Sequence, residues 1–204
     1  MTTKILLAGL LGGIAMFMWE GLAHEALPLG EAGLSGLPNE AAIVATVKDN
    51  VKQSGFYIFP GGEMLQPGLS GAQREEAEKK GAELWRAGPS GIIVVHPEGM
   101  ETGSTAMLVR QCLFDIGVTL LAAILLSAAP LAGFGARLAF VTAIGLVPTL
   151  NAELPYWNFY GFPTVFVMAQ ALVHLIGFAV AGVVLGLMVK TQAAKPAVAA
   201  RASA

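Results

Sequence analysis

Cysteine and charged residues are both scarce in this chain. The single cysteine, Cys112, excludes an intrachain disulfide, a CxxC redox pair, a CxxCH haem attachment and a multi-cysteine zinc site. Only 13% of the 204 residues are charged, and the net charge of −2 lacks the basic excess expected of a nucleic-acid-binding protein. The sequence contains no GxxxxGKS/T, GxSxG, HExxH or GxGxxG motif, so it shows none of the usual enzyme signatures.

Apolar residues are abundant instead, at 55% of the chain, and they gather in four long stretches. The stretches are Ile5 to Ala23, Met107 to Ala129, roughly Ala136 to Leu154, and Pro163 to Val189. Each is long enough to be a candidate membrane-spanning helix, although the third has only 15 uncharged residues between Arg137 and Glu153 and needs the preceding Leu131 to Phe134 to reach full length. We therefore expect an α-helical membrane protein with four spans.

The basic residues near the span ends predict the orientation, because Lys and Arg in short loops are retained in the cytoplasm. In a four-span chain, one side receives Lys4, Arg137, Lys190, Lys195 and Arg201. Residues 25–106 hold 11 acidic and 6 basic residues, a net charge of −5, and are expected on the outer face. Aromatic residues fit an interfacial belt on that face: Phe17, Trp19, Tyr156, Trp157, Phe159, Tyr160 and Phe162.

These patterns predict a protein of the bacterial inner membrane with both termini in the cytoplasm. Residues 1–24 form the first helix, residues 25–106 an exported domain, residues 107–189 three further helices, and residues 190–204 a flexible cytoplasmic tail. A cleaved signal peptide is the alternative for residues 1–24, with cleavage near Gly21 to Ala23. The bulky Trp19 and charged Glu20 at the cleavage site oppose that alternative.

Pairs of small residues four positions apart predict close helix packing in the first and last spans. These pairs are Ala8/Gly12, Gly9/Gly13, Gly177/Ala181 and Gly182/Gly186.

The exported segment reads as helix, strand, helix, strand. A first helix is expected from a capping Asn39 to Gly55, and a second follows the capping box of Ser70 and Gln73 and stops at Gly88. The strands are predicted at 56–59 and 92–95, where short apolar runs lie between glycines and prolines. This order suggests a small α/β domain built as a βαβ unit, with parallel strands and a right-handed crossover.

Both predicted strands are apolar on both faces, and two helices cover only one face of such a sheet well. We therefore expect the domain to need a cover. The candidates are an aromatic loop formed by Tyr156 to Phe162, a second copy of the chain, a partner membrane protein, or the membrane surface.

Ionisable residues inside the spans are the main candidates for a site, because a charge in hydrocarbon is costly. An intramembrane polar cluster is predicted from Glu20, His24, Arg110, Asp115 and Glu153. We expect it to be structural, with Arg110 pairing with Asp115 in its own helix or from a neighbouring copy. A proton or ion pathway and simple snorkelling of the charges to the interface are the alternatives.

Gln170 and His174, four residues apart in the last span, are predicted to make a polar contact between helices. The sequence offers two cofactor alternatives. One is a metal held by Glu20 and His24, with His96 and Glu98 as further ligands, and the other is a haem between His24 and His174. The first has too few paired ligands and the second has histidines at unequal depth, so no cofactor or metal is expected.

Three sequence runs carry a resemblance. They are 153–163 (ELPYWNFYGFP), 55–60 (GFYIFP) and 88–91 (GPSG). Together they resemble an uncharacterised family of small bacterial four-span membrane proteins with an exported domain, a resemblance that implies architecture and no activity. The leading functional hypothesis is a non-enzymatic accessory or assembly component. Its expected partners are the lipid bilayer and either a second copy of the chain, in a homo-oligomer, or a partner membrane protein. A transporter or ion-conducting protein that uses the intramembrane carboxylates is the alternative, and an enzyme lacks a recognisable nucleophile or metal set.

Overall fold

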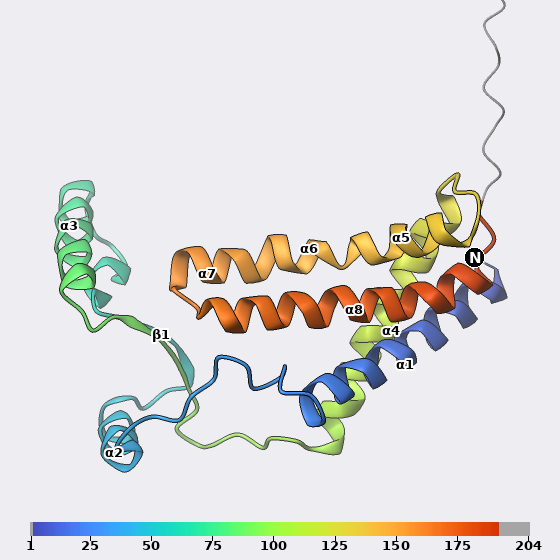
Figure 1. The fold of residues 1–204 in the computed structure, drawn as a ribbon. Helices are drawn as coiled ribbons and strands as arrows, with labels where there is room; N and C mark the ends of the chain where they lie inside the picture. The colour runs from blue at the N-terminus through green and yellow to red at the C-terminus, as the bar shows by residue number, and fades with distance from the viewer. Residues whose placement is uncertain (1, 192–204) are drawn as a thin grey trace, which may run out of the picture. The chain divides into compact units, whose positions relative to one another are not determined.

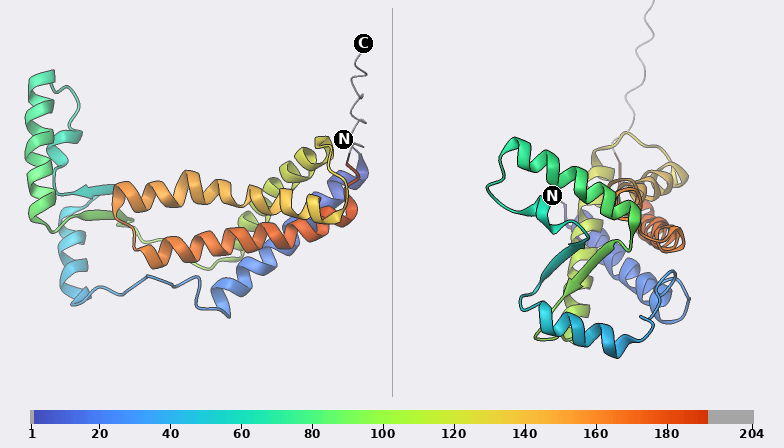
Figure 2. Two further views of the ribbon diagram at one scale, coloured as in Figure 1. Left: turned by 45° about the horizontal axis from the view of Figure 1, so that its top comes forward. Right: turned by 90° about the vertical axis from the view of Figure 1, so that its left-hand side faces the viewer.

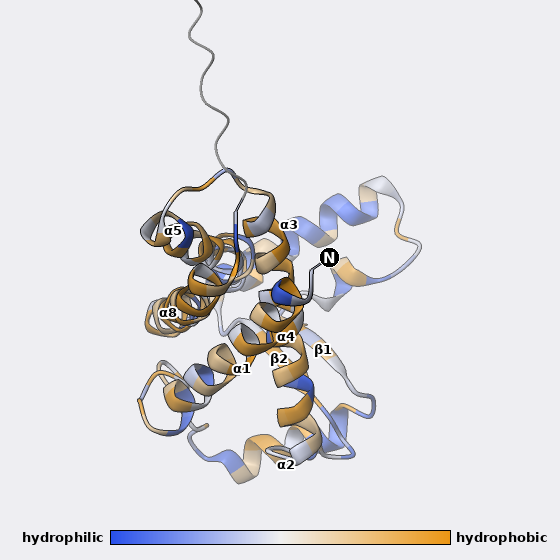
Figure 3. Ribbon diagram, turned by 90° about the vertical axis from the view of Figure 1, so that its right-hand side faces the viewer, coloured by the Kyte–Doolittle hydropathy of each residue, from blue (hydrophilic) through white to orange (hydrophobic). Residues whose placement is uncertain are grey.

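The computed structural model of the protein describes residues 2–191 (Figure 1). Four helical segments are long and apolar enough to cross a membrane: Thr3–Glu25, Thr105–Ala128, Phe134–Tyr160 and Thr164–Met188. They confirm four long apolar helices close to the predicted positions and support a multi-pass membrane protein, with hydrophobic residues covering the long helices in Figure 3. The predicted tail, 190–204, lies outside the described residues beyond position 191.

The chain divides into two compact units. The first, which we call the bundle, holds the residues up to 34, then 103–157 and those from 162 onward. The second, the α/β unit, holds 35–102 together with 158–161.

The third span is longer than the sequence predicted and is not a regular α-helix throughout. It consists of α5 (Phe134–Ile144), α6 (Leu146–Pro148), a π-helical turn η2 (Thr149–Glu153) and α7 (Leu154–Tyr160). Pro148, which has no N–H to donate to the carbonyl of Ile144, directly precedes the wide turn. In that turn the N–H of Leu154 bonds to the carbonyl of Thr149, five residues back. The predicted loop at Tyr156 to Phe162 was therefore wrong, because Tyr156 to Tyr160 continue the helix.

Close contacts of glycines hold α1 (Thr3–Glu25) against its neighbours. α1 packs against α4 (Thr105–Ala128) and α8 (Thr164–Met188). A Cβ atom at Gly9 would lie 2.7 Å from the Cα of Leu120 in α4, and one at Gly13 would lie 2.6 Å from the backbone nitrogen of Ile116. The predicted close packing of α1 is thus confirmed, because only glycine allows backbones to approach so closely.

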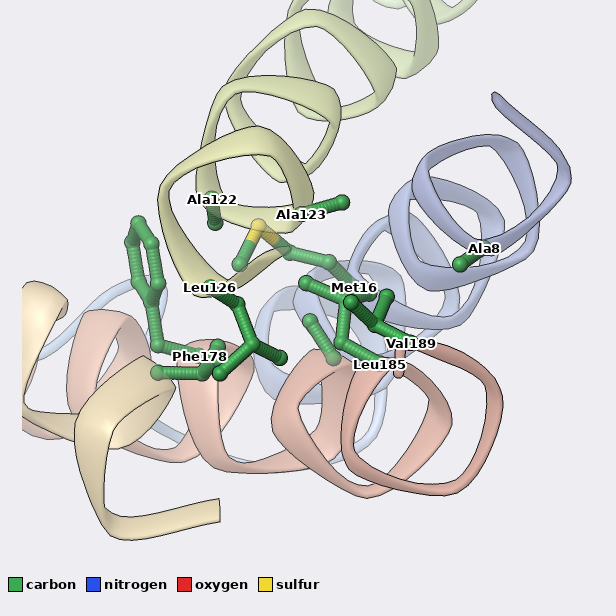
Figure 4. Close-up of a cluster of buried hydrophobic side chains, with 10 residues drawn as sticks. Ala8, Met16, Ala122, Ala123, Leu126, Phe178, Leu185 and Val189 are labelled. Atoms are coloured by element: carbon green, nitrogen blue, oxygen red, sulfur yellow. The ribbon is translucent and has the colours of Figure 1, made fainter. Parts of the chain in front are cut away.

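The last helix, α8, also packs through glycines, on one face against α1 and on another against α5. Gly177 lies under Trp19 of α1, and Gly182 and Gly186 lie under Leu138 and Phe134 of α5. The helices therefore pack in the order α4, α1, α8, α5, and Figure 1 shows α8 running beside the third span. A cluster of buried apolar side chains fills the space between them (Figure 4): Ala8, Met16, Ala122, Ala123, Leu126, Val141, Phe178, Ala181, Leu185 and Val189.

The α/β unit contains two strands, β1 (Gly55–Phe59) and β2 (Gly91–Val95), close to the predicted positions. They pair antiparallel, with Phe59 opposite Gly91, so the predicted parallel βαβ unit was wrong. Between the strands come η1 (Gly62–Leu65) and α3 (Gly71–Ala87), which pack against each other. Because α3 does not lie along the sheet, the chain leaves β1 and enters β2 at the same end of the sheet. Two strands connected at the same end run antiparallel.

The helix α2 (Glu40–Asn50) differs from its prediction at both ends. Asn39 has a left-handed backbone, with φ of 52°, and its side chain makes no capping bond, since capping requires an extended residue at that position. The helix stops at Asn50, before Gly55, which instead begins β1. The capping box of Ser70 and Gln73 at the start of α3 is confirmed.

The glycine contacts lead to a stability prediction. Gly13→Ala should destabilise the bundle by about 1–3 kcal/mol, because the added methyl group meets the backbone of Ile116, which cannot move aside without shifting α4. Gly117→Ala is the matched control, since a Cβ at Gly117 meets no atom within 4 Å. Unfolding of the full chain by SDS titration in dodecyl maltoside measures both. Equal stability of the two variants would contradict the packing described here.

Candidate functional site

An open groove in the bundle brings together most of the polar residues that the sequence singled out. Its volume is about 710 Å³. Its lining comes from three helices and consists of Phe17, Glu20, Gly21, His24 and Glu25 of α1, Leu108 and Gln111 of α4, and Gln170, Val173 and His174 of α8. The volume falls within the range of small-molecule sites in proteins.

The groove opens where the glycine contacts of α1 end. Toward its N-terminal half α1 is held against α4 and α8 through Gly9, Gly12 and Gly13. Trp19 makes the last direct link, donating from Nε1 to the carbonyl of Val173 at 2.9 Å. Beyond it a Cβ atom at Gly21 would meet no atom within 4 Å, and Figures 1 and 2 show α1 diverging from α8.

Gln111 joins the two carboxyl groups of the predicted cluster. Its Nε2 donates to Oδ1 of Asp115 at 2.9 Å, one turn along α4, and to Oε2 of Glu20 of α1 at 3.2 Å. Asp115 is only 4% exposed, and its second oxygen, Oδ2, has no hydrogen-bond partner among the described residues. One neutral amide therefore serves two carboxyl groups across the interface of α1 and α4.

Arg110 does not have the predicted role within its own helix. It is exposed, and no ion pair joins it to Asp115 in the described part of the chain. Gln111 takes that role because a residue four positions away lies on the same helix face, whereas a residue five positions away is rotated off it. Pairing of Arg110 with a neighbouring copy stays a prediction.

His24 is fixed by the backbone around it. Its Nδ1 lies 2.8 Å from the carbonyl oxygen of Glu20, and because a carbonyl oxygen only accepts, Nδ1 carries the donated hydrogen. Gly30 closes on the other side, where a Cβ atom would come within 2.5 Å of the His24 ring.

Glu153 lies against α8 rather than with the Glu20 group. Its Oε1 is 3.1 Å from Nδ1 of His174, a close contact that is not aligned as a hydrogen bond. Glu153 is the last residue of the π-helical turn η2, which packs on α8, and it is only 9% exposed. His174 thus meets a carboxyl group from the third span, while Gln170 lines the groove one turn away.

Sequence reasoning named four polar residues that line this groove, Glu20, His24, Gln170 and His174, and missed Glu25 and Gln111. Gln111 is the one that links two helices. Its spacing of four residues from Asp115 was a signal, since a glutamine and an aspartate at that distance form a known helix-surface pair. The residues 2–191 contain no group of three or more His, Cys, Asp or Glu side chains placed to hold a metal ion.

Comparison of the chain with protein-family models, with characterised proteins and with solved structures finds no match.

The bridging amide leads to a second prediction. Gln111→Leu should lower the free energy of unfolding by about 1–3 kcal/mol, because it removes the donor of Glu20 and Asp115 and leaves buried oxygens unpaired. Adding Asp115→Leu should restore part of that loss, since removing both partners of a buried bond costs less than removing one. SDS titration of the single and double variants gives the coupling.

Arg110→Leu is the control for that cycle and should leave stability unchanged. A loss as large as that of Gln111→Leu would contradict the role of the amide and favour an Arg110 ion pair with a neighbouring copy.

Proposed function

We propose that the protein is a four-span protein of the bacterial inner membrane and a non-enzymatic accessory or assembly component. In this proposal both termini are cytoplasmic, residues 25–106 are exported, and the α/β unit binds a partner membrane protein. The chain would then belong with the four-span proteins that its sequence runs resemble.

The distribution of basic residues within the bundle supports the orientation. Lys4 at the start of α1 and Lys190 after α8 line one pocket with Ser127 near the end of α4. Arg137 donates to the carbonyl of Val189 at 2.8 Å, so it belongs to the same end of the bundle. Three cations at one end are what retention of Lys and Arg in the cytoplasm produces.

Reporter fusions test this topology. Fusions after Gly133, between α4 and α5, and at Ala204 should be fluorescent with green fluorescent protein and inactive with alkaline phosphatase. A fusion at Gly71 should behave in the opposite way, because four crossings put residues 25–106 on the outer face. Fusions at Gly71 and Ala204 that report the same side would contradict the proposed topology.

The observation that carries the accessory role is that the α/β unit has almost no core. Between residues 35 and 102, Gly81 is the one residue that is buried. Phe56 and Val94 lie opposite each other in the sheet, and the Phe56 ring meets Tyr160 edge to face at a centroid distance of 6.2 Å. Phe56 and Val94 are nevertheless 57% and 63% exposed. The helix α2 has no buried residue, and its Val44 is 51% exposed.

Such a unit has little to stabilise it by itself. A two-stranded sheet is marginal in water, and in Figure 2 α2 and α3 lie at opposite ends of the strands instead of across a face. Burial of apolar surface is worth about 25 cal/mol per Å², so covering the Phe56 and Val94 face is favourable for a partner protein. An exposed apolar surface of this kind is typical of an interaction site.

Site-specific photo-crosslinking in living cells tests this role. A photoreactive phenylalanine analogue placed at Val94 should give a discrete adduct with another protein, because that position lies on the uncovered face. The same analogue at Glu76, on the exposed surface of α3, should give none. An adduct with a second copy of this chain would replace the proposed partner by a homo-oligomer. Equal labelling at both positions, or labelling of lipid alone, would overturn the accessory role.

Transport or ion conduction is a second candidate, favoured by one observation. Oδ2 of Asp115 and Oε2 of Glu153 are both buried without hydrogen-bond partners in the described chain, and carboxyl groups in membrane helices often mark ion or proton pathways. Structural and conducting roles differ in what Asp115→Asn changes. A structural role alters stability, whereas a conducting role alters proton flux into liposomes at unchanged stability.

A further inference from the structure

We propose that the groove between α1, α4 and α8 is a binding site for an organic cation with an apolar body, such as a lipophilic amine. This inference does not depend on the accessory role, because it concerns the bundle and the accessory role concerns the α/β unit.

The charges of the groove have one sign. Glu20 and Glu25 line it, and no Lys or Arg is among the lining residues. Asp115 adjoins it through Gln111, and Glu153 through His174. Carboxylates in a low-dielectric region are costly without a countercharge, and a bound cation would supply it.

The hydrogen-bonding groups point to the same ligand. The amide hydrogens of Gln111 already serve two carboxyl groups, and Nδ1 of His24 already serves a backbone carbonyl. The oxygens of Glu20 and Glu25 keep acceptor capacity, and the amide of Gln170 is the one neutral amide donor in the lining beside Gln111. A ligand rich in donors, such as an ammonium group, complements this set, and an anion would be repelled by it.

The walls supply the apolar part of the site. Leu108 and Val173 offer aliphatic surface, and Phe17 adds an aromatic ring, a group whose face attracts cations. A hydrated metal ion would make no apolar contact with these side chains. Residues 2–191 also contain no group of three or more side chains placed to hold a metal ion. An organic cation with an apolar body satisfies both the charges and the walls.

Binding of radiolabelled tetraphenylphosphonium to the full chain tests the proposal. The protein is placed in nanodiscs of zwitterionic phosphatidylcholine, so that lipid charge does not attract the probe, and empty nanodiscs provide the background. We expect saturable binding of about one probe per chain. 4-Phenylbutylamine, an ammonium ion at neutral pH, should displace the probe, whereas 4-phenylbutyrate, with the same body and a negative charge, should not.

Three variants locate the site. Glu20→Gln should weaken binding at least tenfold, because it removes a charge from the groove, and Glu31→Gln, the same change outside the lining, should not alter it. Gly21→Phe should block binding while every carboxyl group stays in place, since a side chain at Gly21 meets no atom within 4 Å of its Cβ and enters open space.

Several results would overturn the proposal. They are binding no greater than to empty nanodiscs, equal displacement by the amine and the acid, and unchanged binding to Gly21→Phe. The competition experiment uses the unmodified protein, so it decides the matter even where Glu20→Gln does not fold. Failure of cation binding would leave the crosslinking test of the α/β unit unaffected.

Discussion

The bundle depends on how closely the backbone of α1 approaches its neighbours. Helices in a membrane gain little from hydrophobic burial against each other, so packing contacts and interhelical hydrogen bonds must hold them. Gly9, Gly12 and Gly13 remove the side chains that would keep α4 and α8 away. The approach also brings Thr119 of α4, which is fully buried, within 2.7 Å of the carbonyl oxygen of Gly9, where its hydroxyl donates a hydrogen bond. Small residues and a polar contact thus reinforce each other at one crossing.

The same constraint explains where the groove lies. Gly9, Gly12 and Gly13 hold one half of α1 tightly against its neighbours, and α1 diverges from α8 beyond these contacts. Trp19 marks that point, because its ring packs on Gly177 and its Nε1 reaches Val173. The polar residues Glu20 and His24 follow directly, so they line an opening instead of a packed interface.

The strongest sequence signals predicted the fold well. Apolar runs of about 20 residues predicted the spans, since few other structures need them, and glycines and prolines around 55–62 and 88–91 bounded the strands correctly. Strand direction was predicted wrongly because it depends on whether α3 packs over the sheet or against η1, and short-range patterns do not report that choice.

For the candidate site, charge and depth in the membrane predicted which residues lie at a similar level, but they did not predict which face of its helix each residue occupies. Glu153 was placed with Glu20 and Asp115 because all three lie toward one end of their helices, and Gln111 was passed over because it is neutral. The structure instead sets Glu153 against His174 and makes Gln111 the link between helices. Which side chains meet depends on the rotation of each helix about its axis. An irregular turn changes that rotation, and the length of an apolar run does not predict it.

The wide turn at Thr149–Glu153 has a consequence for the helix that follows it. A helix advances about 100° per residue, so each residue accommodated by a wide turn rotates everything beyond it by about that angle relative to an unbroken helix. The aromatic residues of α7 therefore lie on a different face of the helix from the one that they would occupy if α5 continued as a regular α-helix. A relative lacking one residue in this turn would keep a third span of nearly the same length and hydropathy, yet present another side of its aromatic end.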